Sequence, residues 1–467
     1  MSQHTLLYGL DDKPGTLTCL TAASQHLLAS FIGVVTPTLI IAGALDLASQ
    51  IPFLISMALF VSGLGTFLQT KKIAGIGSGL VAIQGTSFAF VSTLILAGVS
   101  VRNRGGSDAD VMAMLLGISM AGAMVEIVLS LFIHKLKRLL NPLITGIVIT
   151  SIGLSLIKVG MTDLAGGFGA PDFGDSTHWL VGLLVLLIII FLNAASNHWL
   201  RLSAIFVGMV AGTLLTWFIG DLQFSHLANL PVFAIPTPLK YGLDFDVSLF
   251  LPIALIYVFS ALETAGDLTA NSLFCKQPIA GHIYMNRIKG GILGDGVNSV
   301  IAGLFNTFPN TTFGQNNGVI QLTGIASRKV GLYIAGLYIT MGIFPVIGGV
   351  LQSVPKAALG GATLVMFAMV AVGGLNIMMQ QPFTRRNSLI IAASLGLGMG
   401  VMMVPDSLHT VPAWLASIVS SPVTVAGVTA IFLDTLLPNG SAPPLETTKK
   451  MTTTAIVPPE KGKSPTS

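Results

Sequence analysis

Long apolar segments separated by short polar connections run along almost the whole chain, and they limit the possible folds more than any other feature. Twelve of them lie at residues 18–36, 52–69, 110–133, 142–160, 179–195, 202–220, 248–270, 287–305, 330–350, 357–378, 387–404 and 417–436. A helix needs about 20 apolar residues to cross the hydrocarbon core of a bilayer. Charged residues make up 9% of the chain, whereas a soluble domain has about 25%. The sequence therefore predicts an all-α polytopic membrane protein.

Two shorter segments, 86–98 and 314–327, bring the expected number to fourteen and are interrupted by polar residues. The NTT run at 310–312 favours extended backbone. The helical part that follows has about 14 residues, or roughly 20 Å, which is too short to cross a membrane. Irregular backbone at membrane depth occurs only where protein or a water-filled cavity satisfies its polar groups. We therefore expect a short strand and a half-helix in each segment, meeting at a binding site near the membrane midplane. The alternative is a polar re-entrant loop that only packs helices.

The two short segments also indicate an internal repeat. Gly77–Phe90 (GSGLVAIQGTSFAF) is a glycine-rich extended run followed by a short helix, and residues 308–327 repeat that plan. The tenth segment comes seven positions after the third. Because seven is odd, the two halves should be inverted relative to each other in the membrane, as in many secondary transporters.

The distribution of positive charge gives the orientation. With both termini in the cytoplasm, 18 of the 23 Lys and Arg residues lie inside, as the positive-inside rule requires. The outer side keeps Arg102, Arg104, Lys158, Lys240 and Lys356. We therefore expect fourteen segments with cytoplasmic termini. The stretch 441–467 is rich in Pro, Ser, Thr and Lys and should form a disordered cytoplasmic tail.

Composition argues against several other classes. The basic residues are spread along the loops and form no patch of the kind that binds nucleic acid. Cys19 and Cys275 are the two cysteines and lie far apart, so we expect neither a disulfide framework nor a metal site. The first fifteen residues include Asp11, Asp12 and Lys13 and do not have the pattern of a signal peptide.

Ionisable residues within apolar segments are costly and mark functional sites. Glu263 and Asp267 are four residues apart and so share one helix face. Two neighbouring carboxylates repel as anions, and burial also favours the neutral acid, so the pair suits a group that gains and loses a proton in each cycle. The alternative is a hydrogen-bonded pair that holds helices together. Asp295 on the next segment is either a proton relay or a structural anchor.

Three further ionisable residues have weaker cases. His26 lies in the first segment, and a supporting role fits it better than direct contact with a substrate. Glu126 and Lys158 belong to no cluster in the sequence, so we interpret both as packing or interface groups.

The polar groups of the expected site indicate the kind of ligand. A Glu263 carboxylate accepts ring N–H bonds, and the Gln315 carboxamide offers one acceptor and two donors. Two half-helix N-termini add backbone donors and positive dipole ends. Phe88 begins a short helix after Ser87, so its ring could stack on a flat ligand, although an aromatic residue is more often part of a core. This set fits a planar heterocycle with alternating N–H and C=O groups better than a sugar or a metal ion.

Several motifs in order resemble the nucleobase–ascorbate transporter family, and within it the bacterial xanthine permeases. The likeness extends over roughly residues 10–437. It rests on QNNGVIQLTG from Gln315, SALETAGDLTA with Glu263 and Asp267, RIKGGILGDG with Asp295, SQHLLA with His26, and IQGTSF with Ser87.

The resemblance implies a fold and a mechanism. It implies a seven-plus-seven inverted repeat in which residues 1–140 and 246–350 form a core domain and residues 141–245 and 351–440 form a gate domain. The core would move past the gate like an elevator while proton symport drives uptake, with no cofactor beyond the proton gradient. It further implies a homodimer in the lipid of the bacterial inner membrane and a small-molecule purine base as substrate.

Site residues carry over by motif. Glu263 and Gln315 would hold the purine, Phe88 and Gly314 would frame it, and Ser87 would tune which purines fit. A glutamate at the position of Gln315 would have indicated uracil.

A second group of residues would support proton coupling and the geometry of the site. The resemblance places Asp267, Asp295, His26 and Asn316 in this group.

The function predicted is proton-coupled uptake of a purine, xanthine first. One alternative is a urate or broader purine and uracil symporter. Another is an anion channel or uniporter of similar fold, against which the two carboxylates argue because they would repel the permeant ion. A membrane-embedded enzyme has no visible nucleophile–base pair, metal-ligand cluster or phosphate loop, so we do not expect an enzyme.

Overall fold

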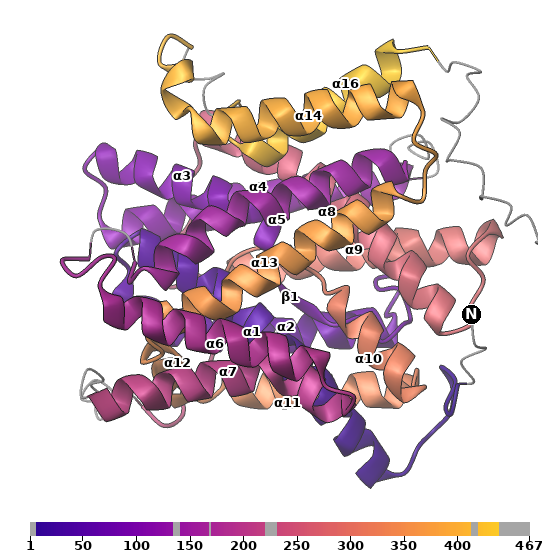
Figure 1. The fold of residues 1–467 in the computed structure, drawn as a ribbon. Coiled ribbons are helices and arrows are strands. Elements are labelled where there is room, and N and C mark those ends of the chain that lie inside the picture. Colours follow the sequence, from indigo (N-terminus) through magenta and orange to yellow (C-terminus); the bar gives the residue numbers. More distant parts are fainter. Residues whose placement is uncertain (1–5, 134–140, 168–169, 220–230, 412–418, 439–467) are drawn as a thin grey trace, which may run out of the picture.

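The computed structural model describes the chain except residues 1–5, 134–140, 168–169, 220–230, 412–418 and 439–467 (Figure 1). The expected tail at 441–467 and the start of the last expected apolar segment lie outside the described residues. The first half contains α1 (Thr16–Ala44), η1 (Ala48–Gln50), α2 (Ile51–Lys71), β1 (Gln84–Thr86), η2 (Phe88–Phe90), α3 (Val91–Asn103), α4 (Asp108–Phe132), α5 (Pro142–Leu164), α6 (Ser176–Ala194) and α7 (His198–Ile219). The second half contains α8 (Val247–Phe274), α9 (Gly281–Leu304), β2 (Asn310–Thr312), α10 (Gln315–Thr323), α11 (Arg328–Gly342), α12 (Pro345–Gln352), α13 (Lys356–Met378), α14 (Arg385–Met403), η4 (Pro405–Leu408) and α16 (Pro422–Leu436).

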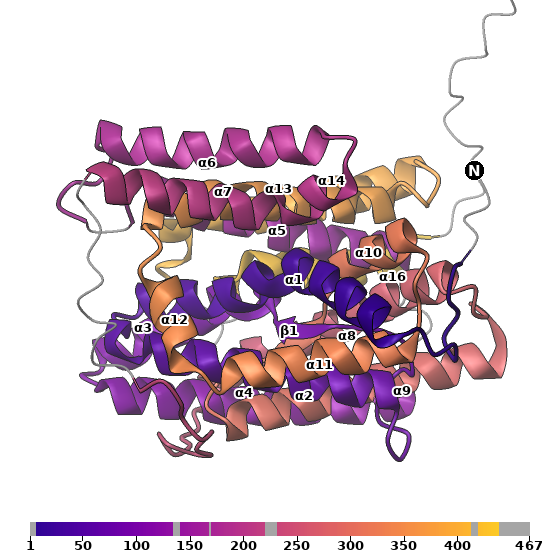
Figure 2. The ribbon, with the colours of Figure 1, turned by 90° about the horizontal axis from the view of Figure 1, so that it is seen from below.

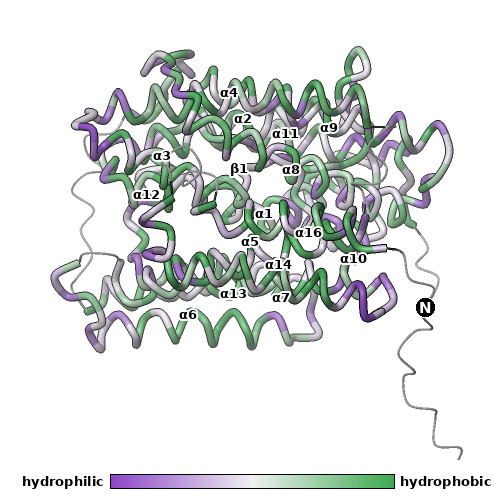
Figure 3. Tube along the Cα trace, turned by 90° about the horizontal axis from the view of Figure 1, so that it is seen from above, coloured by the Kyte–Doolittle hydropathy of each residue, from purple (hydrophilic) through white to green (hydrophobic). Residues whose placement is uncertain are grey.

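The protein is mostly helical, and its helices are those of an integral membrane protein. Among the described residues, eight helices are long and apolar enough to cross a membrane, or nine if the bent pair α11–α12 is one span. Apolar residues occupy the helix bodies, and hydrophilic residues gather in the connections at the two ends (Figure 3). Each of the fourteen expected segments contains a helix or half-helix, although not all of them meet the criterion for a full crossing.

One expected segment is wrong in detail. Residues 330–350 form two helices, α11 and α12, that meet at an angle of 78°. The reason is Pro345 at the start of α12, which cannot donate a backbone hydrogen bond and forces extended backbone on Phe344 (φ −108°, ψ 92°).

The helices lie in layers. α6 and α7 form the outer layer on one side, and α2, α4, α9 and α11 lie on the opposite side, with α1 and β1 between them (Figure 2). The most extensive packing joins α5 to α13, α2 to α11, α4 to α9, α14 to α16 and α6 to α7.

Polar residues fix the starts of several helices outside the apolar core. Ser107 forms a capping box with Asp110 at the start of α4, and Asn141 and Ser421 cap α5 and α16. Asp246 caps α8 and also pairs with Arg104 over 2.7 Å. The hydrogen bond from Arg104 lowers the pKa of Asp246 to about 2. Because this pKa is depressed, the stabilisation is lost only as the pH falls toward that value, and the cap persists at physiological pH.

The two short strands form the buried centre of the fold. β1 and β2 pair antiparallel, with Gln84 opposite Thr312 and Gly85 opposite Thr311. A Cβ on Gly85 would lie 2.6 Å from the Phe313 ring and 2.8 Å from Val34, so only glycine allows this close packing. The strands expected before the two half-helices are therefore present.

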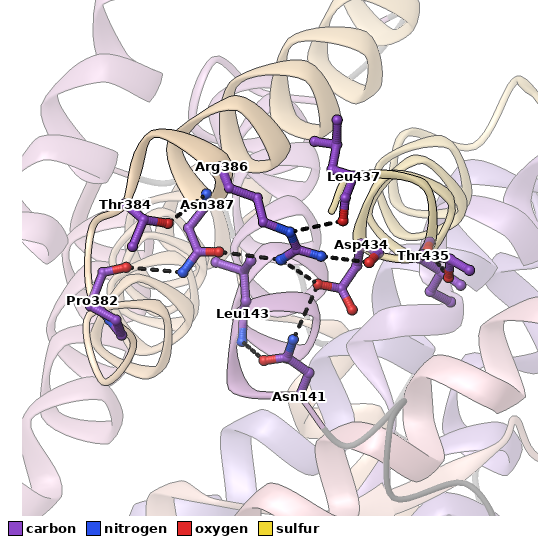
Figure 4. A network of polar contacts seen from close by, with 10 residues as sticks. Asn141, Leu143, Pro382, Thr384, Arg386, Asn387, Asp434, Thr435 and Leu437 are labelled. Carbon is purple, nitrogen blue, oxygen red and sulfur yellow. Dashed lines mark hydrogen bonds and ion pairs between the residues drawn. The ribbon is translucent and has the colours of Figure 1, made fainter. Parts of the chain in front are cut away.

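Arg386 joins α14 to the end of α16 (Figure 4). Its Nη1 donates to the Asp434 carboxylate over 3.0 Å and its Nη2 to the Asp434 carbonyl over 2.5 Å. Its Nε donates to the Leu437 carbonyl over 3.2 Å. Asn141, which caps α5, reaches the same Asp434 oxygen over 3.5 Å. Three helices are thus tied together at one end by one arginine and one carboxylate.

Asp434→Asn should therefore destabilise the protein by about 1–2 kcal/mol, because the pair is only partly shielded from solvent and loses its charge-assisted bonds. The measurement is the melting temperature of the purified protein in detergent. Arg385→Gln, a charge loss at the exposed neighbouring residue, is the control. An equal shift in both variants would contradict the assigned role of Asp434.

Candidate functional site

The candidate site lies where the β1–β2 ribbon meets the two half-helices. η2 and α3 follow β1, and α10 follows β2. α1 contacts β1 and α10, while α8 contacts β2, η2 and α10. α1, α8 and both half-helices therefore surround the ribbon at the centre of the fold (Figure 1).

Glu263 and Asp267 lie on α8, and both are partly exposed within this otherwise buried region. The two carboxylates are close enough to interact electrostatically. The Glu263 carboxylate makes no hydrogen bond to any group in the part of the chain that the structure describes, so it is available to a ligand. The two residues predicted from the sequence therefore lie on one face of α8, as expected.

Gly314 brings Asp267 to the start of α10. The Asp267 carboxylate faces the backbone N–H of Gly314, and a Cβ added to Gly314 would fall on that carboxylate. The N-terminus of a helix carries partial positive charge and attracts an anion. The absence of a side chain at Gly314 is therefore what allows this contact.

Two asparagines that the sequence interpretation did not assign attach α10 to α8. The Asn317 Nδ2 donates to the Asp267 carbonyl over 3.1 Å. The Asn271 Nδ2 donates to Asn317 Oδ1 over 2.8 Å and to the Val81 carbonyl over 3.0 Å. The signal in the sequence is an amide side chain inside an apolar segment, which needs a partner when buried.

Asp295 on α9 is fully buried and is the hub of the polar contacts beneath the site. Gln69 and Gln84 donate to its Oδ1 over 2.6 and 2.8 Å. The Thr264 hydroxyl and the Thr312 backbone N–H donate to its Oδ2 over 2.5 and 3.1 Å. The carboxylate thus joins α2, β1, α8 and β2, as a structural anchor would, and the proton relay stays a prediction.

His26 and Asn316 lie in contact with each other. The Asn316 Nδ2 lies 3.1 Å from both the Nδ1 and the carbonyl oxygen of His26. Ser30 donates to the His26 carbonyl and shares a hydrogen bond of 2.7 Å with the Tyr338 hydroxyl. These hydrogen bonds attach α10 to α1 and α11, and Asn316 connects His26 to the half-helix α10.

Phe88 and Ser87 lie at the start of the other half-helix. The Phe88 ring packs edge-to-face on Phe367 of α13, with ring centroids 5.4 Å apart. Ser87 is buried, and its hydroxyl accepts from the Ala89 backbone N–H over 3.3 Å. Ser87 therefore caps the half-helix, while Phe88 packs against α13.

Three other sequence assignments have different outcomes. Gln315 begins α10, but its side chain lies outside what the structure describes, so its role stays a prediction. Glu126 is fully buried, and neither of its carboxylate oxygens has a hydrogen-bond partner among the described residues. Lys158 is exposed on α5.

Comparisons with known proteins support a transporter. A family model described as "Permease family" matches residues 17–407. Xanthine permease XanP of Escherichia coli (strain K12) is 45% identical over 438 residues, which are 93% of this chain and 95% of the relative. Xanthine permease XanQ of the same organism is 43% identical over 439 residues, 93% of this chain and 94% of the relative.

A solved structure is similar in fold. The transmembrane domain of the cyanobacterial bicarbonate transporter BicA superposes with a TM-score of 0.56 at 15% identity, covering 88% of this chain and 99% of that domain. At this identity the likeness concerns the fold alone.

The contacts of Asp295 lead to a prediction about stability. Asp295→Asn replaces one acceptor oxygen of the carboxylate by an NH2 group, which donates. Where this group faces the Gln69 and Gln84 amides, two buried donors lose their acceptor. We expect destabilisation of more than about 2 kcal/mol, measured as a lower melting temperature and lower accumulation in the membrane. Asp406→Asn, at an exposed position, is the matched control and should melt like the parent. A parental melting temperature for Asp295→Asn would refute the anchor.

Proposed function

The chain belongs to the nucleobase–ascorbate transporter family, whose members are permeases and not enzymes, and from this premise we propose that it takes up a purine nucleobase, xanthine first, across the bacterial inner membrane. The observation that carries the substrate is the level of identity to the two xanthine permeases along nearly the whole chain. We place both termini in the cytoplasm, because that orientation puts most of the positive charge inside.

The chemistry of the site supports a flat base with ring N–H and C=O groups. The Glu263 carboxylate, which has no hydrogen-bond partner among the described residues, would accept ring N–H bonds. Backbone N–H groups at the start of α10 and the Gln315 amide would donate to ring carbonyls. Phe88 would cover one face of the ring, and Ser87 would limit the space at its edge.

We propose that Asp267 and Glu263 carry the coupled proton. They share one face of α8, and the Asp267 carboxylate lies against Gly314 at the start of α10. His26 and Asn316 would hold α10 in place, and Asp295 would hold the ribbon.

Matching contacts in the two halves support a seven-plus-seven repeat of fourteen segments. Segments seven positions apart would correspond. α2 would then be equivalent to α9, and α4 to the bent helices α11 and α12. α2 packs on α11 as α9 packs on α4, and α6 packs on α7 as α14 packs on α16. α1 contacts α2 and β1 as α8 contacts α9 and β2. The antiparallel β1–β2 pair would lie on the axis that relates the halves.

We further propose an elevator movement of a core (1–140 and 246–350) past a gate (141–245 and 351–440). In support, α5, α6, α7, α13, α14 and α16 pack mainly on one another. The Phe88–Phe367 contact crosses between the two groups. α6 and α14 are the least buried of the candidate spans, at 22% and 17%, and their apolar faces would meet lipid or the second subunit of a homodimer.

A second candidate, an anion uniporter, is favoured by the likeness of the fold to a bicarbonate transporter. The carboxylates of Glu263 and Asp267 disfavour it because they would repel the anion. Electrical recordings showing anion current without purine would support this candidate, and a urate or broader purine symporter would appear in competition experiments.

The experiment that tests the proposal is uptake of labelled xanthine by cells that lack their own purine permeases, with and without a protonophore. Unlabelled urate, uracil, hypoxanthine and guanine serve as competitors. Uptake that the protonophore abolishes and few purines inhibit is expected. Xanthine uptake insensitive to the protonophore would refute proton coupling, and no xanthine uptake by protein present in the membrane would refute the substrate.

Glu263→Gln should abolish xanthine uptake, because an acceptor-only group becomes an amide and the titratable charge is lost. Loss of one charge-assisted bond alone weakens binding about 10- to 100-fold. Binding of labelled xanthine to purified protein is the direct measurement, and Asp406→Asn is the control. Parental binding by Glu263→Gln would remove this residue from the site.

Gly314→Ala should impair uptake roughly tenfold or more, because the added methyl group overlaps the Asp267 carboxylate and such overpacking costs about 1–3 kcal/mol. Gly318→Ala lies on the same half-helix, and its Cβ would meet nothing within 4 Å, so it should transport normally. Equal loss in both variants would indicate an effect of helix propensity and not of the contact with Asp267.

A further inference from the structure

A groove of about 390 Å³ opens at the end of α2, away from the candidate site. It is lined by Thr70, Lys71, Lys72, Gly79, Arg328 and Leu332. A Cβ on Gly79 would lie 3.6 Å from Lys72 Cδ and 3.5 Å from Arg328 Nη2. The long side chains of two cations therefore converge over one glycine at the wall of the groove.

Lys71 is a third cation that lines the groove, and Arg287 of α9 is close enough to Lys72 to affect its charge. The Arg287 side chain is only 7% exposed. Its Nη2 donates to the Gln277 Oε1 over 3.1 Å, while its Nη1 is buried and has no hydrogen-bond partner among the described residues. Burial lowers the pKa of Lys72, and the charges of Arg287 and Arg328 lower it further. Lys72, Arg287 and Arg328 are thus close enough to repel one another, and Arg287 has a buried donor that lacks an acceptor among the described residues.

The counter-charge near these cations is small. Among the ion pairs of the described residues, Asp11 is the carboxylate that reaches the cluster, by pairing with Arg328. The Asp11 side chain is 87% exposed, so solvent screens most of its effect. Arg328 also begins α11, whose N-terminus adds partial positive charge. The groove therefore has an excess of positive charge, and the buried Arg287 guanidinium near it would gain from an anion.

We propose that this groove binds a phosphate group. Guanidinium groups match phosphate oxygens with paired hydrogen bonds, and a lysine adds a mobile point charge. The volume suits a phosphate ester with part of its substituent. The proposed orientation puts the groove on the cytoplasmic side, where anionic headgroups and soluble phosphorylated metabolites both occur.

The groove lies between the two segments that carry the half-helices. Gly79 precedes β1, and Arg328 follows α10; the Arg328 Nε donates to the Gly79 carbonyl over 2.7 Å. α2 and α11 pack side by side here (Figure 2). A bound phosphate would join these segments a second time and so stabilise the folded protein.

The test uses the full-length protein in nanodiscs. One arm adds inorganic phosphate against chloride at equal ionic strength to discs of zwitterionic lipid, and the other compares those discs with discs that contain phosphatidylglycerol. The readout is the melting temperature and its dependence on phosphate. Lys72→Gln, at an exposed position, should weaken the effect roughly tenfold, as expected for one charge-assisted bond, and Arg287→Gln should abolish it. Arg385→Gln removes the same charge far from the groove and should change nothing.

Phosphate stabilisation that depends on Lys72 supports a soluble ligand. Stabilisation by phosphatidylglycerol alone, with the same dependence, supports a lipid headgroup. No stabilisation in either arm, or equal effects of Lys72→Gln and Arg385→Gln, overturns the proposal. Because no transport is measured, the result is independent of the proposed substrate.

Discussion

The fold depends on one buried carboxylate. Two short strands in the middle of an apolar protein expose backbone groups that the hydrocarbon of a membrane cannot satisfy. Asp295 accepts from the backbone of β2 and from Gln84 of β1, while Gln69 and Thr264 bring α2 and α8 to the same two oxygens. Removing this carboxylate would release the ribbon, and with it the starts of both half-helices.

The site residues divide according to whether their hydrogen bonds are already used. His26, Asn316 and Ser87 are buried and bonded to protein groups, so they determine where the half-helices lie. Glu263 is partly exposed, and its carboxylate has no bond to the described residues. Asp267 stands between these groups, since it is partly exposed but rests against the backbone of Gly314. The two carboxylates that we propose for the ligand and the proton therefore lie on one face of α8.

Much of this arrangement follows from the sequence, because apolar length, polar interruption and charge asymmetry are local signals. They place a helix in each expected segment, a strand before each half-helix, and Glu263 and Asp267 on one face. The hydrogen bonds of Asp295 could not be predicted, because its partners come from four distant segments. Asn271 and Asn317 were missed for the same reason. The bend at Pro345 was missed because a long apolar run concealed a local backbone constraint.

The antiparallel register of β1 and β2 has an electrostatic consequence. Because the strands run in opposite directions, the half-helices that follow them leave the ribbon in opposite directions, and the positive ends of both helix dipoles point back toward the middle. Two like partial charges therefore face each other across the ribbon, and the Asp267 carboxylate offsets part of the one at α10. A ring with an oxygen at each of two opposite edges would relieve both ends at once, whereas a ligand with a single acceptor would relieve only one. The geometry of a three-residue strand pair thereby favours a symmetric distribution of acceptors in the ligand.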